Sequence, residues 1–266
     1  MWKLNNKNGV KYYTISSFEE TGFVRHGFST REGGVSEGCY ASMNLRFHCD
    51  DTHENVLKNY EIIAETLGMD HTRLVLSKQI HEDIIHTATE NDLGNGVTRE
   101  NAFTSVDALI TDKPNIPLVT LYADCTPVFF LDPKKRVIAL AHSGWRGTVK
   151  RISSKVIDKM KKDYGSDSAD ILTAIGPSIQ MDNFEVGDEV AEIFLREFGE
   201  TTVKKYGEKY HVNMQKAIKI QLMQAGVSEN NIDDCGIDTY SNSGFLFSHR
   251  KTNGKRGNMG AFIELK

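Results

Sequence analysis

The stretch that most constrains the fold is residues 117–151, which hold two apolar runs, Val128–Leu131 and Val137–Ala141. Both runs are rich in Val, Ile, Phe and Leu and lack the alternation of a half-buried strand. This pattern is typical of strands covered on both faces. Residues 132–135 (DPKK) separate the runs and favour a turn. The stretch therefore predicts a buried β-hairpin.

The register of this hairpin brings two reactive side chains together. With residues 132–135 as the turn, Cys125 lies directly opposite His142. Opposed side chains in an antiparallel pair have Cβ atoms ~5 Å apart. A thiolate and an imidazole at that separation can bind one zinc ion or form a Cys–His nucleophile pair. Pro127 cannot donate to the ladder, so we expect an edge, a bulge or a crossover at this end.

A glycine-containing turn, His142–Gly147, follows the second run, and a helical pattern extends from about Thr148 to Tyr164. A strand, such a turn and a helix N-terminus are typical of an anion site, because free N–H groups and the helix dipole point into the turn. Arg146 adds a planar guanidinium suited to phosphate. The pattern predicts a phosphate site beside the thiol, with an ordinary turn and a buried structural cysteine as the alternatives.

Size and composition narrow the class of protein. A chain of 266 residues without repeats or linkers predicts one domain, residues 1–266. The net charge of −4, without a basic stripe, argues against a nucleic-acid partner. Four scattered cysteines without CxxC spacing argue against a zinc finger or a disulfide framework. The chain shows neither an apolar run long enough to span a membrane nor a signal peptide, so we expect a cytoplasmic protein without a membrane partner.

Short strand patterns outnumber helices along the chain and occur partly as hairpins, which favours mixed sheets with outer helices. Helices are also predicted over Asp51–Leu67 with Asp51 as the cap, over Gly187–Phe198, and from a cap at Asn213 to Ala225. Strands are predicted at residues 8–15, 22–29, 73–77, 84–87, 107–111, 171–175, 203–206, 209–212, 232–237, 245–249 and 261–265.

Motifs along most of the chain resemble those of the YfiH-like family. This family is also named for laccase domains and multicopper polyphenol oxidases, and is now described as a family of purine nucleoside phosphorylases. The resemblance covers roughly residues 22–265 and implies a single-domain α+β fold, with mixed β-sheets packed together and helices on the outside. The matching segments are HGFSTREGGVS (26–36), SMNL (42–45), SKQIH (77–81), DALIT (107–111), LYADCTPVFFLD (121–132), ALAHSGWRGT (139–148), AIGPSI (174–179) with FEVGDEV (184–190), and FSHR (247–250).

The resemblance implies a catalytic zinc centre held by His81, Cys125 and His142, with copper as the alternative metal. These residues lie in the QIH, ADC and AHSGW motifs. His81 by itself reads as an ordinary surface or hydrogen-bonded histidine, so its assignment rests on the resemblance. Three protein ligands leave a fourth position open, as in catalytic zinc sites.

The activity that the resemblance implies is phosphorolysis of adenosine, inosine, guanosine and methylthioadenosine, together with hydrolytic deamination of adenosine. Zinc lowers the pKa of water to ~7, which suits deamination. Phosphorolysis requires a phosphate site, for which we expect Arg46, Arg146 and Arg250, with Asn44 as a further substrate contact. The expected partners are purine nucleosides and phosphate, bound by a monomer or a homodimer.

Two points about the substrate contacts are left open. Asp124 and His26 are candidates for protonating the departing purine from residue type alone. Relatives often carry a tyrosine and paired arginines near the carboxy terminus, where this chain has SHRK at residues 248–251. This departure puts a second arginine contact in doubt.

Three other functions would use the same residues. A cysteine hydrolase or amidase would use Cys125 as nucleophile and His142 or His81 as base. A structural zinc site in a binding protein would require a fourth ligand, such as Cys49, Cys39 or His26. A copper-dependent polyphenol oxidase could use the two histidines and the cysteine but requires further copper centres. No HxH pairs are formed by His26, His48, His53, His71 and His86.

Overall fold

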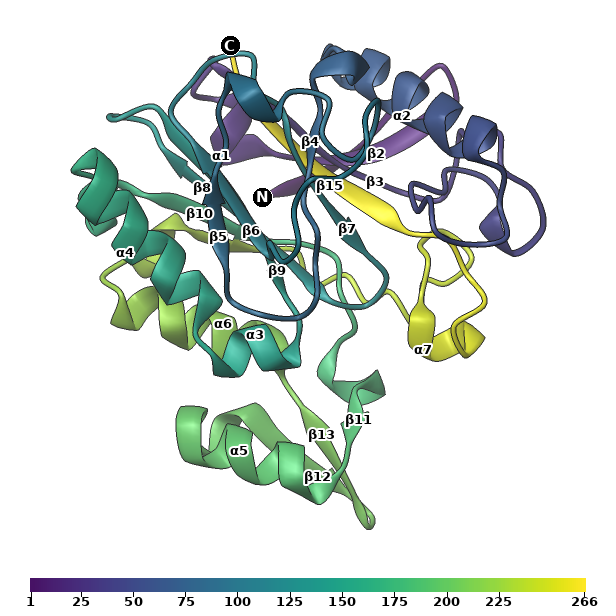
Figure 1. The fold of residues 1–266 in the computed structure, drawn as a ribbon. Helices are drawn as coiled ribbons and strands as arrows, with labels where there is room; N and C mark the ends of the chain where they lie inside the picture. The colour runs from purple at the N-terminus through teal and green to yellow at the C-terminus, as the bar shows by residue number, and fades with distance from the viewer.

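Two six-stranded β-sheets form the centre of the structure, a computed structural model that describes residues 1–266 (Figure 1). The first sheet contains, in spatial order, β1 (Trp2–Lys7), β2 (Val10–Ile15), β3 (Val24–Ser29), β15 (Met259–Leu265), β7 (Leu118–Tyr122) and β4 (Val75–Leu76). The second contains β14 (Ile232–Asp234), β10 (Leu172–Ile175), β8 (Thr126–Asp132), β9 (Val137–Ser143), β6 (Ala108–Thr111) and β5 (Ile85–Thr87). Both sheets mix parallel and antiparallel pairs.

Helices cover the outer faces of the two sheets (Figure 1). The largest buried cluster lies between the sheets, and two further clusters lie under α2 on the first sheet and under α4 and α6 on the second. The α+β prediction, with mixed sheets packed together and helices outside, is therefore confirmed. No helix combines the length and the apolar character needed to cross a membrane. The helices are α1 (Ser16–Glu19), α2 (His53–Leu67), α3 (Trp145–Val149), α4 (Ile152–Tyr164), α5 (Asp188–Phe198), α6 (Met214–Gln224) and α7 (His249–Thr252).

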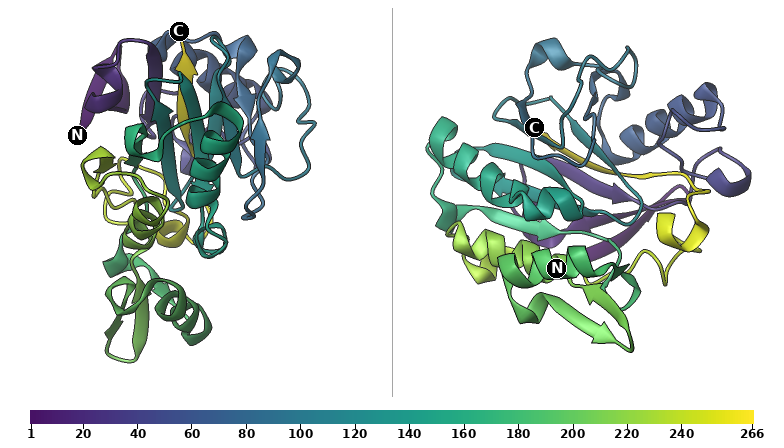
Figure 2. Two further views of the ribbon diagram at one scale, coloured as in Figure 1. Left: turned by 90° about the vertical axis from the view of Figure 1, so that its left-hand side faces the viewer. Right: turned by 60° about the horizontal axis from the view of Figure 1, so that its bottom comes forward.

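A small three-stranded sheet extends away from the two large sheets together with α5 (Figure 2). It consists of β11 (Glu185–Val186), β13 (Lys209–Val212) and β12 (Val203–Tyr206). The predicted hairpin of residues 203–212 and the helix capped by Asn213 are confirmed, since the Asn213 side chain accepts a hydrogen bond from the backbone of Lys216. This unit has its own small apolar cluster.

The central hairpin forms as predicted, and every residue of β8 and β9 is buried. Its register differs from the expected one by two residues, because Pro127 rather than Cys125 pairs with His142. The Asp132 carboxylate accepts the N–H groups of residues 134 and 135 and keeps Asp132 in the strand, while Arg136 completes the turn at φ 55°. Because side chains alternate between the two faces of a strand, a register shift of two residues leaves Cys125 on the same face of the sheet as His142. The strand that contains Pro127 is an interior one, with β9 on one side and β10 on the other.

Several element boundaries differ from the predicted ones for local reasons. The predicted helix from Thr148 begins earlier, at Trp145, and is interrupted at Arg151, which has φ 61°. The N-cap of α2 is Thr52 rather than Asp51, because the Thr52 side chain accepts the N–H of Asn55.

Two strand predictions are also corrected, and one strand of the first sheet was not predicted. The amino terminus forms a two-stranded hairpin, β1 and β2, where one strand was expected over residues 8–15. Residues 245–249 are not a strand, and α7 begins at His249. The strand β7 had no counterpart among the predicted elements, although it lies beside β15 in the first sheet.

Candidate metal centre and cleft

Three side chains with metal-binding atoms meet where the two large sheets approach each other. His81 lies in the connection between β4 and β5, Cys125 immediately precedes β8, and His142 lies on β9. One potential ligand atom from each residue lies within 4.8 Å of the other two. His142 is buried, Cys125 is half-buried, and His81 is exposed. The two imidazole rings meet edge to face, with centroids 4.9 Å apart.

Gly144 lets these three side chains come together. A Cβ atom at this position would lie 2.6 Å from Nδ1 of His81 and 3.5 Å from Sγ of Cys125. Its backbone has φ −72° and ψ 170°, which any residue can adopt, so the requirement for glycine comes from space rather than conformation. The glycine of the predicted turn thus packs directly against the metal-binding atoms.

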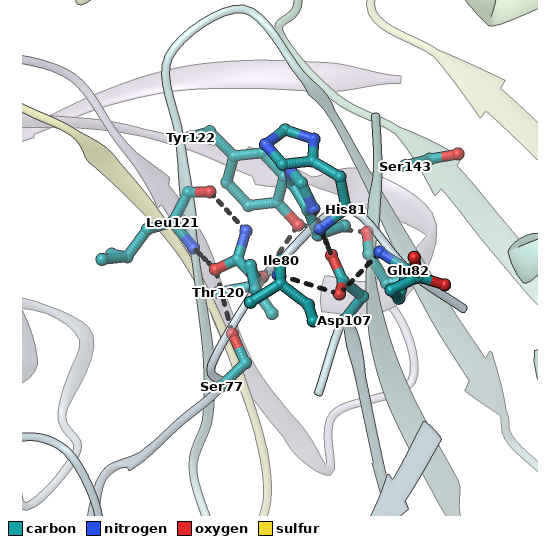
Figure 3. A network of polar contacts seen from close by, with 12 residues as sticks. Ser77, Ile80, His81, Glu82, Asp107, Thr120, Leu121, Tyr122 and Ser143 are labelled. Carbon is teal, nitrogen blue, oxygen red and sulfur yellow. Dashed lines mark hydrogen bonds and ion pairs between the residues drawn. The ribbon is translucent and has the colours of Figure 1, made fainter. Parts of the chain in front are cut away.

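Asp107 lies beneath the segment that carries His81 (Figure 3). Its fully buried carboxylate accepts the backbone N–H groups of Ile80, His81 and Glu82 at 3.0–3.1 Å. The same carboxylate lies 2.8 Å from Nδ1 of His142. One side chain therefore contacts both histidine-bearing segments. Sequence reasoning missed this residue, whose only signal was its position at the start of the DALIT motif.

Gln79 fixes the same segment to the first sheet. Its side-chain amide donates to the carbonyl of Leu121 at 2.8 Å, and its carbonyl oxygen accepts the N–H of Leu121 at 2.7 Å. The hydroxyl of Ser77 also donates to this oxygen. The segment is therefore attached to β7 of one sheet through Gln79 and, through residues 80–82, to Asp107, which directly precedes β6 of the other sheet.

The charges of Cys125 and His142 stabilise each other. Burial raises the pKa of the Cys125 thiol, but the neighbouring imidazoles of His142 and His81 outweigh it and hold the pKa below its usual value. Burial lowers the pKa of His142, yet the Cys125 sulfur and the Asp107 carboxylate raise it above the ordinary value. In Asp107 the penalty of burial is overcome by His142 and the backbone donors, so its pKa is lowered. The environment therefore favours a thiolate, which is the form that binds metal.

The donor set fits a soft or borderline metal ion. Two imidazoles and one thiolate suit zinc and also copper. No fourth His, Cys, Asp or Glu joins the group, so the fourth ligand expected for a structural zinc site is not supplied. No second group of three such residues is gathered elsewhere in the chain, so the further copper centres of the oxidase interpretation are not built from protein ligands.

The three residues line a cleft with a volume of about 570 Å³. One part of its wall is cationic, with the side chains of Arg46, Arg250 and Arg256. The His249 imidazole lies in the same part of the wall, where burial and the charge of Arg256 lower its pKa and favour the neutral ring. Another part contains the Lys78 ammonium, for which the structure shows no ion pair. A negatively charged ligand would therefore find compensating charge within the same cavity as the metal-binding atoms.

Arg256 is the arginine that sequence reasoning missed. Its guanidinium donates to the carbonyl of Gly257 and to the side chain of Asn258, and it lies 3.2 Å from Nδ1 of His249. The Nε–H group is buried without a hydrogen-bond partner in the protein. Burial, reinforced by the charge of Arg46, lowers the pKa of the Arg256 guanidinium. These features describe a cation that an anionic ligand would stabilise.

Arg250 lies beside a carboxylate at the edge of the cleft. Its backbone N–H donates to Asp124 at 2.7 Å, and its guanidinium donates to the carbonyl of Glu185 at 2.9 Å. Asp124 also lines the cleft and accepts a hydrogen bond from the hydroxyl of Thr239 at 2.6 Å. Both residues therefore lie at the cavity. Arg250 is the predicted phosphate contact, and Asp124 is one of the two candidates for protonating the purine.

Two predicted substrate contacts lie outside the cleft. Arg146 is exposed and its guanidinium stacks over the Trp145 ring, 4.4 Å from the centroid. Arg146 lies within α3, which has only five residues, so the expected anion site at the N-terminus of this helix lacks a substantial helix dipole. Asn44 is fully buried and accepts the backbone N–H groups of Arg46 and Asn258. It joins two loops of the cleft wall instead of contacting the cavity.

His26 is also remote from the cleft. It is buried on β3, and its Nε2 accepts the N–H of Ile15 at 2.8 Å. Burial lowers the pKa of His26 to about 4, so the ring stays neutral as an acceptor. His26 is therefore removed as a candidate for protonating a purine, and it does not supply a ligand to the metal-binding group.

Comparison with known proteins gives consistent results over almost the whole chain. Residues 25–266 match the family model described as multi-copper polyphenol oxidoreductase laccase. The chain is 32% identical over 244 residues to purine nucleoside phosphorylase YlmD of Bacillus subtilis, covering 90% of this chain and 88% of that protein. It is 33% identical over 257 residues to a purine nucleoside phosphorylase of Bacteroides thetaiotaomicron, covering 95% and 94%. The crystal structure of hypothetical protein YfiH from Bacillus licheniformis superposes with a TM-score of 0.92 at 31% identity, covering 99% of both chains.

Proposed function

We propose that this chain, which belongs to the multi-copper polyphenol oxidoreductase laccase family, is a metal-dependent purine nucleoside phosphorylase. The observation that carries the proposal is that His81, Cys125 and His142 lie in the wall of the same cleft as three arginines. Relatives with about a third of their residues identical, over about nine-tenths of their length, are named purine nucleoside phosphorylases. The cleft therefore offers both the metal-binding atoms and the anion-binding charge that the reaction needs.

In phosphorolysis the bond between the sugar C1′ and the purine nitrogen breaks, and a phosphate oxygen forms the new bond to C1′. The departing purine takes up a proton. Arg46, Arg250 and Arg256 would hold the phosphate, because guanidinium groups match the geometry of its oxygens. Asp124 and Lys78 line the cleft and would contact the base or supply its proton.

His81, Cys125 and His142 would hold zinc, because three protein ligands leave a fourth position open, as in catalytic zinc sites. We propose zinc over copper because copper oxidase chemistry would require further copper centres, and only one group of possible ligands is gathered. A bound zinc ion would supply Lewis-acid chemistry and would lower the pKa of water at the site. The same centre would support the hydrolytic deamination of adenosine. The nucleosides proposed as substrates are adenosine, inosine, guanosine and methylthioadenosine.

Product analysis tests this function directly. Protein of known zinc content is incubated with adenosine, with and without phosphate, before and after treatment with a chelator. Adenine that forms only with phosphate and disappears on chelation supports the phosphorylase. Inosine formed without phosphate supports deamination at the same metal. No product in any reaction of the zinc-loaded protein overturns the proposal.

A pair of variants identifies the residue on which the chemistry depends. Cys125→Ala is expected to lose zinc and nucleoside turnover while it keeps the fold, because it removes one of three metal donors. Cys39→Ala is the matched control, since Cys39 is an exposed free cysteine outside the cleft. Full turnover by Cys125→Ala protein that lacks zinc would contradict the assignment.

A cysteine hydrolase is the second candidate, because one observation favours it. Cys125, His142 and Asp107 form a series in which the imidazole contacts both the thiol and a buried carboxylate, as in a nucleophile, base and orienting acid. That mechanism leaves His81 without a role. Rapid alkylation of Cys125 by iodoacetamide, together with an amidase activity indifferent to chelators, would favour this candidate.

A further inference from the structure

We propose that Asp107 is a positioning residue whose single carboxylate sets both histidines of the metal centre at once. The inference rests on the proposed function only in taking His81 and His142 as metal ligands. Asp107 does not belong to the three-residue group itself, and it lies behind the histidines rather than in the lining of the cleft. Its effect on a metal ion would therefore be exerted through the two ligands.

The hydrogen bonds require a carboxylate with both oxygens acting as acceptors. One oxygen accepts the His81 N–H at 3.1 Å and faces Nδ1 of His142 at 2.8 Å. The other accepts the N–H groups of Ile80 at 3.1 Å and Glu82 at 3.0 Å. Backbone N–H groups can only donate, and an ionised carboxylate is the side chain that can accept from four donors without providing one.

The contact with His142 selects which ring nitrogen faces a metal. When Nδ1 donates its proton to Asp107, only Nε2 keeps a free lone pair. Metal-binding histidines commonly donate their second nitrogen to a carboxylate, which fixes the tautomer and the ring orientation. Asp107 would do this for a ring that is otherwise enclosed between the strands.

The contact with His81 holds an uncommon backbone conformation. His81 has φ 67°, in the left-handed region, which is unfavourable for a residue with a side chain. Three consecutive N–H groups around this residue converge on the carboxylate, an arrangement that binds anions. Without the negative charge these donors would lose their common acceptor, and the His81 side chain would lose its fixed direction.

The Asp107→Asn variant tests the role of the carboxylate alone, because it leaves the backbone bonds of the residue in place. The backbone of Asp107 donates to the carbonyl of Ile84 and accepts the N–H of His142, and both bonds survive the substitution. An asparagine amide has one oxygen and one NH₂ group. In either orientation its NH₂ faces two of the four donors, so the variant keeps the volume and disrupts one half of the contacts.

Zinc affinity, measured by competition with a chromophoric chelator, is the first readout. Asp107→Asn is expected to bind zinc 10- to 100-fold more weakly than the wild type, the range found when partners behind metal ligands are removed. Asp92→Asn is the matched control. The Asp92 carboxylate also accepts a backbone N–H, from Thr89, and contacts a histidine, His86, but it touches none of the three ligands. Its zinc affinity should equal that of the wild type.

Amide hydrogen exchange in the metal-free protein is the second readout. The amides that face the new NH₂ group, either that of His81 or those of Ile80 and Glu82, are expected to exchange faster in Asp107→Asn, while amides of the central hairpin keep their protection. Unchanged zinc affinity, or unchanged exchange at these amides, overturns the inference. Failure of the wild type to bind zinc would instead overturn the metal requirement of the proposed function, and the exchange experiment would still decide whether Asp107 holds the His81 segment.

Discussion

Gly144→Ala is the sharpest test of the packing around the metal centre. The new methyl group would lie 2.6 Å from Nδ1 of His81, whereas ordinary contacts begin at 3.4 Å. The ring of His81 must therefore move by about 0.8 Å, several times the ~0.2 Å tolerance of metal–ligand distances. A displacement of ~1 Å at a catalytic group costs about 100-fold. We expect zinc affinity and kcat/KM each to fall by about 100-fold.

The same substitution should have little effect on folding. Gly144 has φ −72° and ψ 170°, so alanine is not strained, and the expected cost is that of alanine at a helix N-cap, at most about 1 kcal/mol. Gly187→Ala is the matched control, because Gly187 caps α5 with φ −73° and ψ 164° and a Cβ there meets nothing within 4 Å. Both variants would be compared by chelator competition, nucleoside turnover and urea unfolding. Wild-type zinc affinity in Gly144→Ala would refute the geometry of the centre.

Two further predictions concern the cationic wall and the sheet interior. Arg256→Ala is expected to raise the KM for phosphate about 10- to 100-fold, which corresponds to the loss of one charge-assisted hydrogen bond. Arg146→Ala should leave this KM unchanged, because Arg146 lies outside the cleft. Equal effects of the two variants in steady-state kinetics would contradict this prediction. Burial lowers the pKa of His26 from 6.5 to about 4, so the unfolded chain binds this proton first as the pH falls. The free energy of unfolding should therefore decrease by about 3 kcal/mol between pH 6.5 and 4. In urea unfolding His26→Gln should remove this decrease. If the free energies of unfolding of the variant and the wild type fell in parallel with pH, His26 would not be the residue responsible.

The central hairpin was predictable because its signal is local. Two apolar runs of strand length with a polar turn between them have few other solutions, and the structure buries both on each face. The register was not predictable from the runs alone. It depends on whether Asp132 joins the strand, and its carboxylate decides this by accepting two turn N–H groups. The predicted pairing of Cys125 with His142 was wrong in detail, although the shift by two residues keeps their side chains on one face.

The cleft was only partly predictable because its wall comes from distant segments. Arg256 carries no motif, and it enters the site because the loop before β15 lies beside the loop of Arg46. The chain lacks paired arginines at residues 248–251, yet Arg256 brings a second guanidinium to the cavity beside Arg250. Asp107 was equally hidden, since four donors from two segments meet it only after the sheets form.

Asn44 shows why a residue in a shared motif need not contact substrate. Asn44 is predicted as a substrate contact, but its side chain is fully buried between the loops that carry Arg46 and Asn258. Its carbonyl oxygen accepts from both loops, and its amide donates to Asp51 at 2.8 Å. The cationic wall therefore depends on Asn44 for its shape, as the metal-binding group depends on Asp107. In both halves of the cleft, a buried side chain that does not reach the cavity joins two segments that are distant in sequence. A motif residue can therefore have a structural role that is independent of catalysis.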